Sequence, residues 1–139
     1  QKLRDRNLHI EVHLEGPRLA PCLAELADQG VNLVVDHFGL PSEPLPSDDP
    51  LIQAVVALQD RSAIYFKFAA HYRIPFDVRP HAERLLSLLP ADHVVWGSDW
   101  PHTQHEQLTS YPQVRDFADV WGAMSDRKAV KCLYGLETV

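Results

Sequence analysis

The chain has 139 residues, enough for one domain with one sizeable hydrophobic core. Hydrophobic residues make up 45% and charged residues 23%, as in an ordinary soluble globular protein, and no apolar run approaches the roughly 20 residues that cross a bilayer. The formal net charge of -6 disfavours a nucleic-acid partner, because phosphate backbones are usually bound by basic surfaces. We therefore expect no membrane and no nucleic acid among its partners.

The two cysteines, Cys22 and Cys132, lie far apart in the sequence and lack CxxC spacing. The sequence also has no signal-peptide pattern. Such cysteines are typical of buried free thiols in a reducing compartment. We therefore predict a cytoplasmic protein without a disulfide.

Four β-type runs recur along the chain, and each is followed by a segment with helical periodicity. The runs are residues 8–14, 31–36, 63–68 and 93–97. The helical segments are residues 17–29, 50–58, 80–89, 111–124 and 126–134. This repetition predicts βα units, in which parallel strands are joined by right-handed crossovers.

Prolines and aspartates mark the expected helix starts. Pro17 and Pro50 suit the first helical position, where the missing backbone N–H has no helical partner to lose. Asp48 or Asp49 could cap the helix that begins at Pro50. Gly30 suits the residue just beyond the C-terminus of the first helix.

Alternation inside two of the runs favours a barrel over an open sheet. Glu11 and His13 alternate with apolar residues in the first run, as do Tyr65 and Lys67 in the third. A parallel sheet covered on both faces would be more uniformly apolar, whereas the lumen of a barrel can carry function. The pattern predicts an α/β fold of the TIM-barrel type. Lys67 then either forms an ion pair with Glu11 in the lumen or takes part in the chemistry.

Ionisable residues stand at the ends of three predicted strands: His13, Asp36 with His37, and Asp99. In a parallel α/β barrel these ends converge on the catalytic face. Two histidines and a carboxylate there could bind a divalent metal, or could polarise a carbonyl and activate water. The alternative for His13 is a hydrogen-bonded interior histidine, and we expect Asp36 to cap a turn or to orient His37. A structural role is favoured for His102.

Longer segments carry a family resemblance. Residues 33–39 (LVVDHFG), 64–73 (IYFKFAAHYR) and 94–102 (VVWGSDWPH) resemble the sixth, seventh and eighth strands of the amidohydrolase superfamily, in the branch that includes 2-pyrone-4,6-dicarboxylate lactonase. Residues 8–15 then correspond to the fifth strand. The resemblance spans essentially the whole chain and implies the C-terminal half, strands five to eight, of a (β/α)8 TIM barrel.

The resemblance also implies a lactonase-like hydrolase acting on a small carboxylated or cyclic substrate without a cofactor. Asp99 corresponds to the general base that takes a proton from the hydrolytic water, and His37 to the histidine that polarises the carbonyl or its oxyanion. Arg73 corresponds to an arginine that recognises a substrate carboxylate. Tyr72 and Lys67 are expected to contact the substrate as well.

A metal-dependent hydrolase or decarboxylase of the same superfamily is the alternative. In that branch His13 and Asp99 would bind a divalent metal such as Zn²⁺. The sequence departs from the lactonase pattern at Leu40, where arginine is common, and this weakens the case for a pyrone dicarboxylate as substrate.

A complete barrel takes about 250 residues, and four strands cannot close a cylinder. We therefore expect residues 1–139 to form a single partial barrel domain, as a fragment of a longer chain. The missing N-terminal half or a second copy would then cover the lumen surface around Tyr65 and Lys67. An inactive fragment or assembly partner is the remaining alternative.

Overall fold

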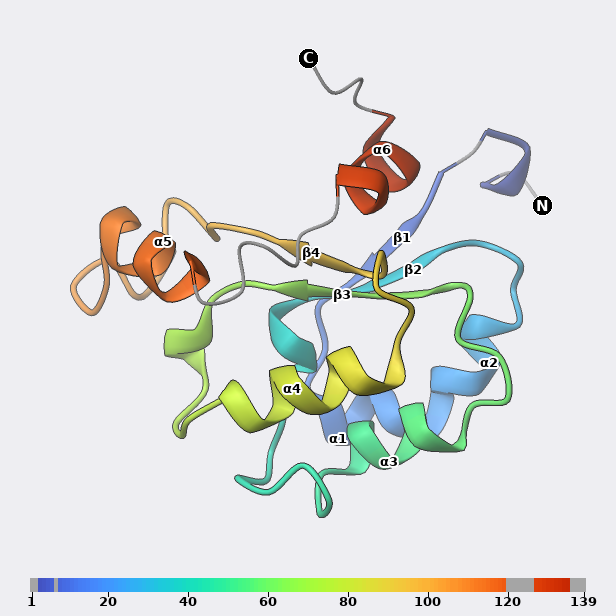
Figure 1. Cartoon of the computed structure of the whole chain (residues 1–139), viewed down its shortest axis with the longest axis horizontal. Coiled ribbons are helices and arrows are strands. Elements are labelled where there is room, and N and C mark those ends of the chain that lie inside the picture. The colour runs from blue at the N-terminus through green and yellow to red at the C-terminus, as the bar shows by residue number, and fades with distance from the viewer. Residues whose placement is uncertain (1–2, 7, 120–126, 136–139) are drawn as a thin grey trace.

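The computed structural model describes residues 3–6, 8–119 and 127–135. A four-stranded parallel sheet forms its centre (Figure 1). The strands are β1 (Ile10–Val12), β2 (Leu33–Val35), β3 (Ile64–Phe68) and β4 (Val94–Trp96). The α-helices are α1 (Gly16–Leu19), α2 (Leu23–Ala27), α3 (Pro50–Ala57), α4 (Arg79–Leu88), α5 (Tyr111–Asp119) and α6 (Arg127–Tyr134). Short 3-10 turns are η1 (Arg4–Arg6), η2 (Ala20–Cys22), η3 (His37–Gly39) and η4 (His71–Arg73).

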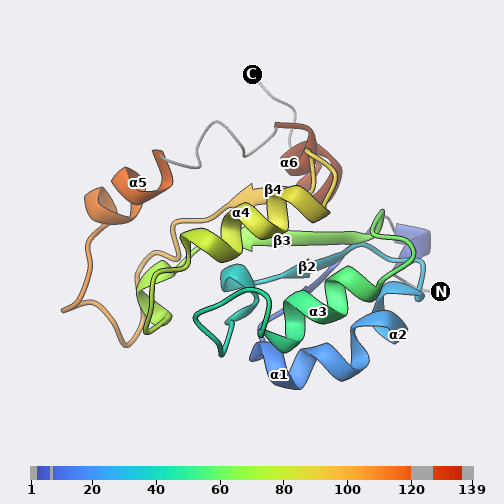
Figure 2. The ribbon, with the colours of Figure 1, turned by 60° about the horizontal axis from the view of Figure 1, so that its bottom comes forward.

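The sheet has the connectivity of a barrel. Its strand order, β1-β2-β3-β4, follows the chain, and every neighbouring pair is parallel. A doubly wound sheet instead reverses its order at a switch point and carries crossover helices on both faces. Here the four helices α1 to α4 lie on the same face of the sheet (Figures 1 and 2). The fold is α/β, with the arrangement of half a (β/α)8 barrel, as predicted.

The alternation seen in the sequence divides each strand between two faces. Ile64, Phe66 and Phe68 of β3 point into the core beneath the helices, and each is at most 2% exposed. Helical side chains that complete this core are Leu19, Leu23, Ile52, Val55, Ala82 and Leu85. Burying one large apolar side chain contributes about 1.5–3 kcal/mol, so this layer is the main source of stability.

The opposite face, which corresponds to a barrel lumen, is partly covered by α6 (Figure 1). A second buried cluster forms between them from Val34, Tyr65, Val95, Ala129 and Leu133. Tyr65 is only 6% exposed. α6 therefore buries Tyr65, which is one part of the lumen surface that we expected a partner to cover.

Element boundaries differ from the sequence predictions, most clearly in the first βα unit. The first strand is confined to Ile10–Val12 rather than residues 8–14. The first helical segment is broken by η2, because Pro21 has no backbone N–H to continue the helix. Residues 120–126, where the predicted helical segment 111–124 ends and the segment 126–134 begins, lie outside the described residues.

The cysteines are free, as predicted, but the expected burial is wrong. Cys22 is half-buried in η2, and Cys132 is exposed on α6. Both lie on helical segments that have one side open to solvent. Among the described helices, none is long and apolar enough to cross a membrane.

The start of α3 is fixed by Asp49. Its Oδ1 accepts hydrogen bonds from the backbone N–H of Leu51 (3.0 Å) and Ile52 (3.1 Å), and its Oδ2 accepts one from Ser42 N–H (2.9 Å). The carboxylate is fully buried, so it joins the preceding loop to the helix from inside the fold. This settles the choice that the sequence left between Asp48 and Asp49.

Replacing Asp49 by alanine is expected to lower the free energy of unfolding by about 1–3 kcal/mol, because it removes a cap and leaves buried donors unpaired. Asp48→Ala is the matched control, since Asp48 is exposed and should change stability by less than about 0.5 kcal/mol. Urea denaturation followed by circular dichroism measures both. Equal midpoints for the two variants would contradict the capping role.

Candidate active site

Because the strands are parallel, the loops that follow them gather along the edge of the sheet formed by the C-terminal ends of all four strands. Left-handed backbone conformations concentrate there. A positive φ is uncommon and costly for residues other than glycine, and it often marks a functional site. The non-glycine residues with positive φ are His37, Phe38 and Leu40 after β2, Ala70 after β3, and Asp99, His102 and Gln104 after β4.

Asp99 is the centre of this edge. Its Oδ2 accepts hydrogen bonds from the hydroxyl of Tyr72 (2.5 Å) and from Nε of Arg73 (3.0 Å). Nη2 of Arg73 also lies 3.0 Å from this oxygen. The second oxygen, Oδ1, lies 3.9 Å from Nε2 of His37. The structure thus brings together four of the residues that the sequence singled out.

The environment of Asp99 favours its ionised form. Partial burial would raise the pKa of this carboxyl, but the hydrogen bonds from Tyr72 and Arg73 and the nearby His37 outweigh it, so the pKa is lowered. Asp99 is therefore a carboxylate at neutral pH. A carboxylate held in this way can orient a water molecule and accept its proton.

His37 is 5% exposed, and this burial lowers its pKa despite the opposing pull of Asp99 and Asp36. The imidazole is therefore neutral at pH 7. Its Nδ1 is buried and has no hydrogen-bond partner within the described part of the chain. A neutral imidazole can donate one N–H to a developing negative charge.

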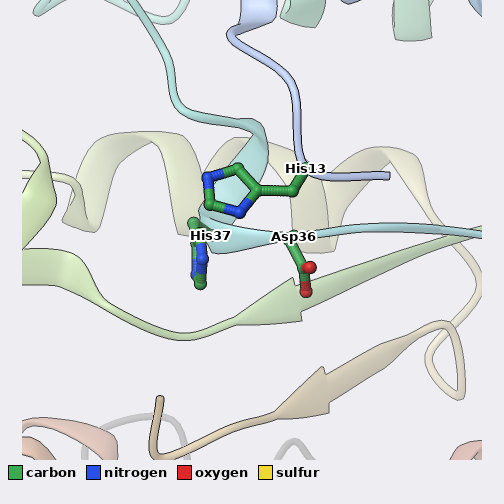
Figure 3. A group of neighbouring side chains, drawn as sticks. All are labelled: His13, Asp36 and His37. Atoms are coloured by element: carbon green, nitrogen blue, oxygen red, sulfur yellow. The ribbon is translucent and has the colours of Figure 1, made fainter. Parts of the chain in front are cut away.

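His13, Asp36 and His37 form a cluster at the ends of β1 and β2 (Figure 3). One potential ligand atom from each lies within 4.8 Å of the others, and the two imidazole rings meet edge to face at 4.7 Å. His13 is exposed, Asp36 half-buried and His37 buried. The metal pair expected from the resemblance was His13 with Asp99. The structure groups His13 with the two residues after β2, and Oδ1 of Asp99 lies 3.9 Å from Nε2 of His37 in this group.

Lys67 lies on the lumen face of β3 between two carboxylates. Its Nζ is 2.8 Å from Oε2 of Glu11 and 3.0 Å from Oδ1 of Asp36. Burial would lower the pKa of Lys67, but these carboxylates outweigh it and raise the pKa. The predicted ion pair with Glu11 is present, and it extends to Asp36. Asp36 therefore pairs with Lys67, and its side chain does not cap the turn at His37, which was one of the two roles expected for it.

Gly97, the first residue of the Gly-Ser-Asp-Trp-Pro motif, makes room for this lysine. A Cβ at this position would lie 3.1 Å from Cδ of Lys67 and 3.4 Å from Cβ of Ala69. The motif thus combines two functions at one strand end. Gly97 accommodates the lumen ion pairs, and Asp99 supplies the carboxylate of the site.

His102, for which a structural role was favoured, lies beside Tyr72 of this site. Its Nδ1 lies 3.2 Å from the hydroxyl of Tyr72, and its ring is 5% exposed. Its position three residues after Asp99 was the only sequence signal. Nearby, Nη2 of Arg73 donates a hydrogen bond to the carbonyl of Thr103, so the loop after β3 is tied to the loop after β4.

Known proteins resemble this chain over most of its length. The amidohydrolase family profile matches residues 1–135. D-galactarolactone isomerase of Agrobacterium fabrum is 28% identical over 116 residues, which are 80% of this chain and 40% of that protein. The 4-sulfomuconolactone hydrolase of Hydrogenophaga intermedia is 25% identical over 117 residues, or 80% of this chain and 38% of that protein. The chain thus spans about 40% of the length of these curated relatives.

Solved structures extend the likeness to the fold. A probable 2-pyrone-4,6-dicarboxylic acid hydrolase of Acinetobacter baumannii, with citric acid bound, has a TM-score of 0.81 at 22% identity, covering 96% of this chain and 55% of that one. A zinc-bound amidohydrolase of Burkholderia multivorans has a TM-score of 0.62 at 17% identity, covering 96% and 52%. The fold is that of about half of these enzymes. By its family match, the chain belongs to the amidohydrolase family.

Proposed function

We propose that the chain provides the catalytic edge of a lactonase-like hydrolase that acts on a small carboxylated substrate. The observation that carries the proposal is the ionised Asp99 at a strand end, with Arg73 and Tyr72 on one oxygen and a neutral His37 beside the other. Two curated relatives are named as enzymes of lactones, which supports the same substrate class.

Asp99 has one oxygen available for the reaction. Tyr72 and Arg73 both use Oδ2, so Oδ1 is left to accept a proton from water. The water oxygen then attacks the lactone carbonyl and forms a tetrahedral oxyanion. When the ring C–O bond breaks, the leaving alkoxide takes up the proton and an open-chain hydroxy acid is released. General-base assistance of this kind typically contributes about 10²- to 10⁴-fold in rate.

His37 stabilises the oxyanion. Its Nε2 lies close to Oδ1 of Asp99, so the same histidine can reach a carbonyl that is attacked by a water bound there. A neutral imidazole with Nε2 protonated donates a hydrogen bond that strengthens as negative charge develops. Such a donor is worth about 2.7–4 kcal/mol in the transition state.

Arg73 is the proposed anchor for the substrate carboxylate: Nε and Nη2 contact Asp99, and the planar guanidinium carries further N–H groups on Nη1 that can donate to a carboxylate. Arg73→Lys should lower kcat/KM for a carboxylated lactone at least about 10-fold more than for its methyl ester, since lysine keeps the charge but loses the paired geometry. Steady-state kinetics with both substrates measures this. An equal loss for both would mean that Arg73 acts only through Asp99.

A metal-dependent hydrolase or decarboxylase is the second candidate, and the cluster of His13, Asp36 and His37 favours it. Two imidazoles and a carboxylate are a donor set that suits Zn²⁺, and the unpaired Nδ1 of His37 could serve as a ligand. A bound ion would polarise the substrate carbonyl. Against this, Asp36 is already neutralised by Lys67, and Asp99 by Arg73. We therefore place the metal-independent reaction first.

The rest of the barrel is proposed to come from an N-terminal half or from a second copy of the chain. Relatives about twice as long support this. The sheet supports it too, because the outer strands β1 and β4 each pair with only one strand in the described part of the chain, whereas a closed barrel pairs every strand on both sides. Light scattering of the purified chain measures the association. A stable monomer would contradict self-association as the source of the other half.

Ring opening of carboxylated lactones tests the proposed function. The purified chain is incubated with galactarolactone, 4-sulfomuconolactone and 2-pyrone-4,6-dicarboxylate, and NMR follows the loss of the ring. We expect at least one lactone to open faster than in buffer. Unchanged rates for all three, with no shift of the Arg73 or Asp99 resonances on addition of substrate, would contradict the proposal.

A further inference from the structure

The hydrogen bonds around Tyr72 fix the position of one proton. The hydroxyl of Tyr72 has a single hydrogen and lies near two possible acceptors, Oδ2 of Asp99 at 2.5 Å and Nδ1 of His102 at 3.2 Å. An ionised carboxylate can only accept, so Tyr72 donates its hydrogen to Asp99. The phenol oxygen is then an acceptor toward His102. It follows that Nδ1 of His102 carries a hydrogen and donates it to Tyr72.

The other nitrogen of His102 supports this assignment. Nε2 is buried and has no hydrogen-bond partner among the described residues. A ring protonated on Nε2 alone would bury an unpaired N–H there and would set the bare Nδ1 against the phenol oxygen. Burying such groups without a hydrogen-bond partner is unfavourable. The tautomer protonated on Nδ1 avoids both penalties, and it leaves only a lone pair without a partner.

The backbone holds the two ends of this chain of hydrogen bonds together. The N–H of His102 donates to the carbonyl of Asp99 at 2.7 Å, and both residues have positive φ (64° and 53°). The side chains of Asp99 and His102 are also linked, through the hydroxyl of Tyr72. Burial, together with the hydrogen bond to Asp99, also raises the pKa of Tyr72, so the phenol keeps its hydrogen through the neutral range.

We propose that His102 is a positioning residue, which acts through Tyr72 to hold Oδ2 of Asp99 and to leave Oδ1 toward the substrate. This rests on the proposed function of Asp99 as general base. Without the bond from His102, the Tyr72 hydroxyl can rotate away from the carboxylate. Asp99 could then turn either oxygen toward Arg73, and its alignment for proton transfer would be lost.

The tautomer of His102 tests the hydrogen-bond chain without any need for activity. Long-range ¹H–¹⁵N NMR of the 139-residue chain, labelled with ¹⁵N-histidine, reads which ring nitrogen carries the hydrogen, and His102→Gln assigns the resonance. We expect Nδ1–H in the wild type and a shift toward Nε2–H in Tyr72→Phe. Tyr111→Phe, at an exposed tyrosine on α5, should leave His102 unchanged. A hydrogen on Nε2 of His102 in the wild type would overturn the proposal. This result does not depend on whether the variants fold.

Kinetics then separates positioning from simple packing. His102→Leu should lower kcat for lactone opening by about 10- to 100-fold with little change in KM, because only the alignment of the base is lost. His102→Asn, whose side-chain amide can donate from nearly the position of Nδ1, should recover much of that loss. Equal kcat for the two variants and the wild type would overturn the proposal. If NMR gives Nδ1–H but no lactone opens even in the wild type, then the proposed function fails while the hydrogen-bond chain stands.

Discussion

Asp99→Asn is expected to reduce kcat for lactone opening by about 10²- to 10⁴-fold while the chain still folds. Asparagine has the same shape as aspartate and can still accept a hydrogen bond from Tyr72. Its amide cannot take a proton from water, however, and it no longer neutralises Arg73. The loss should therefore appear mainly in kcat.

Initial rates with a carboxylated lactone measure this effect, and circular dichroism with urea denaturation checks that the variant is folded. Asp92→Asn is the matched control, because Asp92 precedes β4 and so lies at the opposite edge of the sheet. Its kcat should stay close to that of the wild type. Near wild-type turnover in Asp99→Asn would remove this carboxylate from the mechanism.

Lys67→Met is expected to lower the free energy of unfolding by about 1–3 kcal/mol, since it removes the cation shared by the part-buried Asp36 and the more exposed Glu11. Methionine fills a similar volume beside Gly97, but Glu11 and Asp36 then lose the cation between them. A folded domain has only about 5–15 kcal/mol of net stability, so the loss is large.

Urea denaturation at neutral pH measures the change. Arg18→Met is the matched control, because Arg18 pairs at 3.0 Å with Glu15 on the surface, where both side chains are more than half exposed. Such a pair is worth at most about 1 kcal/mol. If Lys67→Met costs no more than Arg18→Met, then the lumen ion pairs do not stabilise the sheet.

Period-two alternation was enough to predict the barrel-like sheet and its lumen ion pair. Side chains alternate strictly along a strand, so Tyr65 and Lys67 had to share a face opposite Phe66. Parallel strands also bring their ends to one edge, which is why the sequence alone was enough to place Asp99 and His37 together. These predictions depend on local geometry that every βα unit repeats.

Features that depend on long-range packing could not be predicted in the same way. The bond between Tyr72 and His102 joins residues 30 positions apart and requires the left-handed conformation of His102. Lys67 lies equally near Glu11 and Asp36, and no sequence pattern indicates that Asp36 pairs with it rather than with His37.

The position of α6 is a further case. An apolar helix face can pack on either side of a sheet whose two faces both carry apolar residues. Val34 and Val95 provide such residues on the lumen face, and α6 buries them there. Helical periodicity predicts that a helix forms, but it does not specify the surface against which the helix lies.

Lactone opening by metal-free protein is the most direct test of Asp99 as a base that works without a metal ion. The chain is treated with a strong chelator and dialysed, and the rate of ring opening is measured before and after Zn²⁺ is added. If Asp99, His37 and Arg73 carry out the hydrolysis, the rate of ring opening should stay the same after chelator treatment and should not rise when Zn²⁺ is added. A rate that disappears with the chelator and returns with Zn²⁺ would contradict this prediction and would favour the metal-dependent reaction.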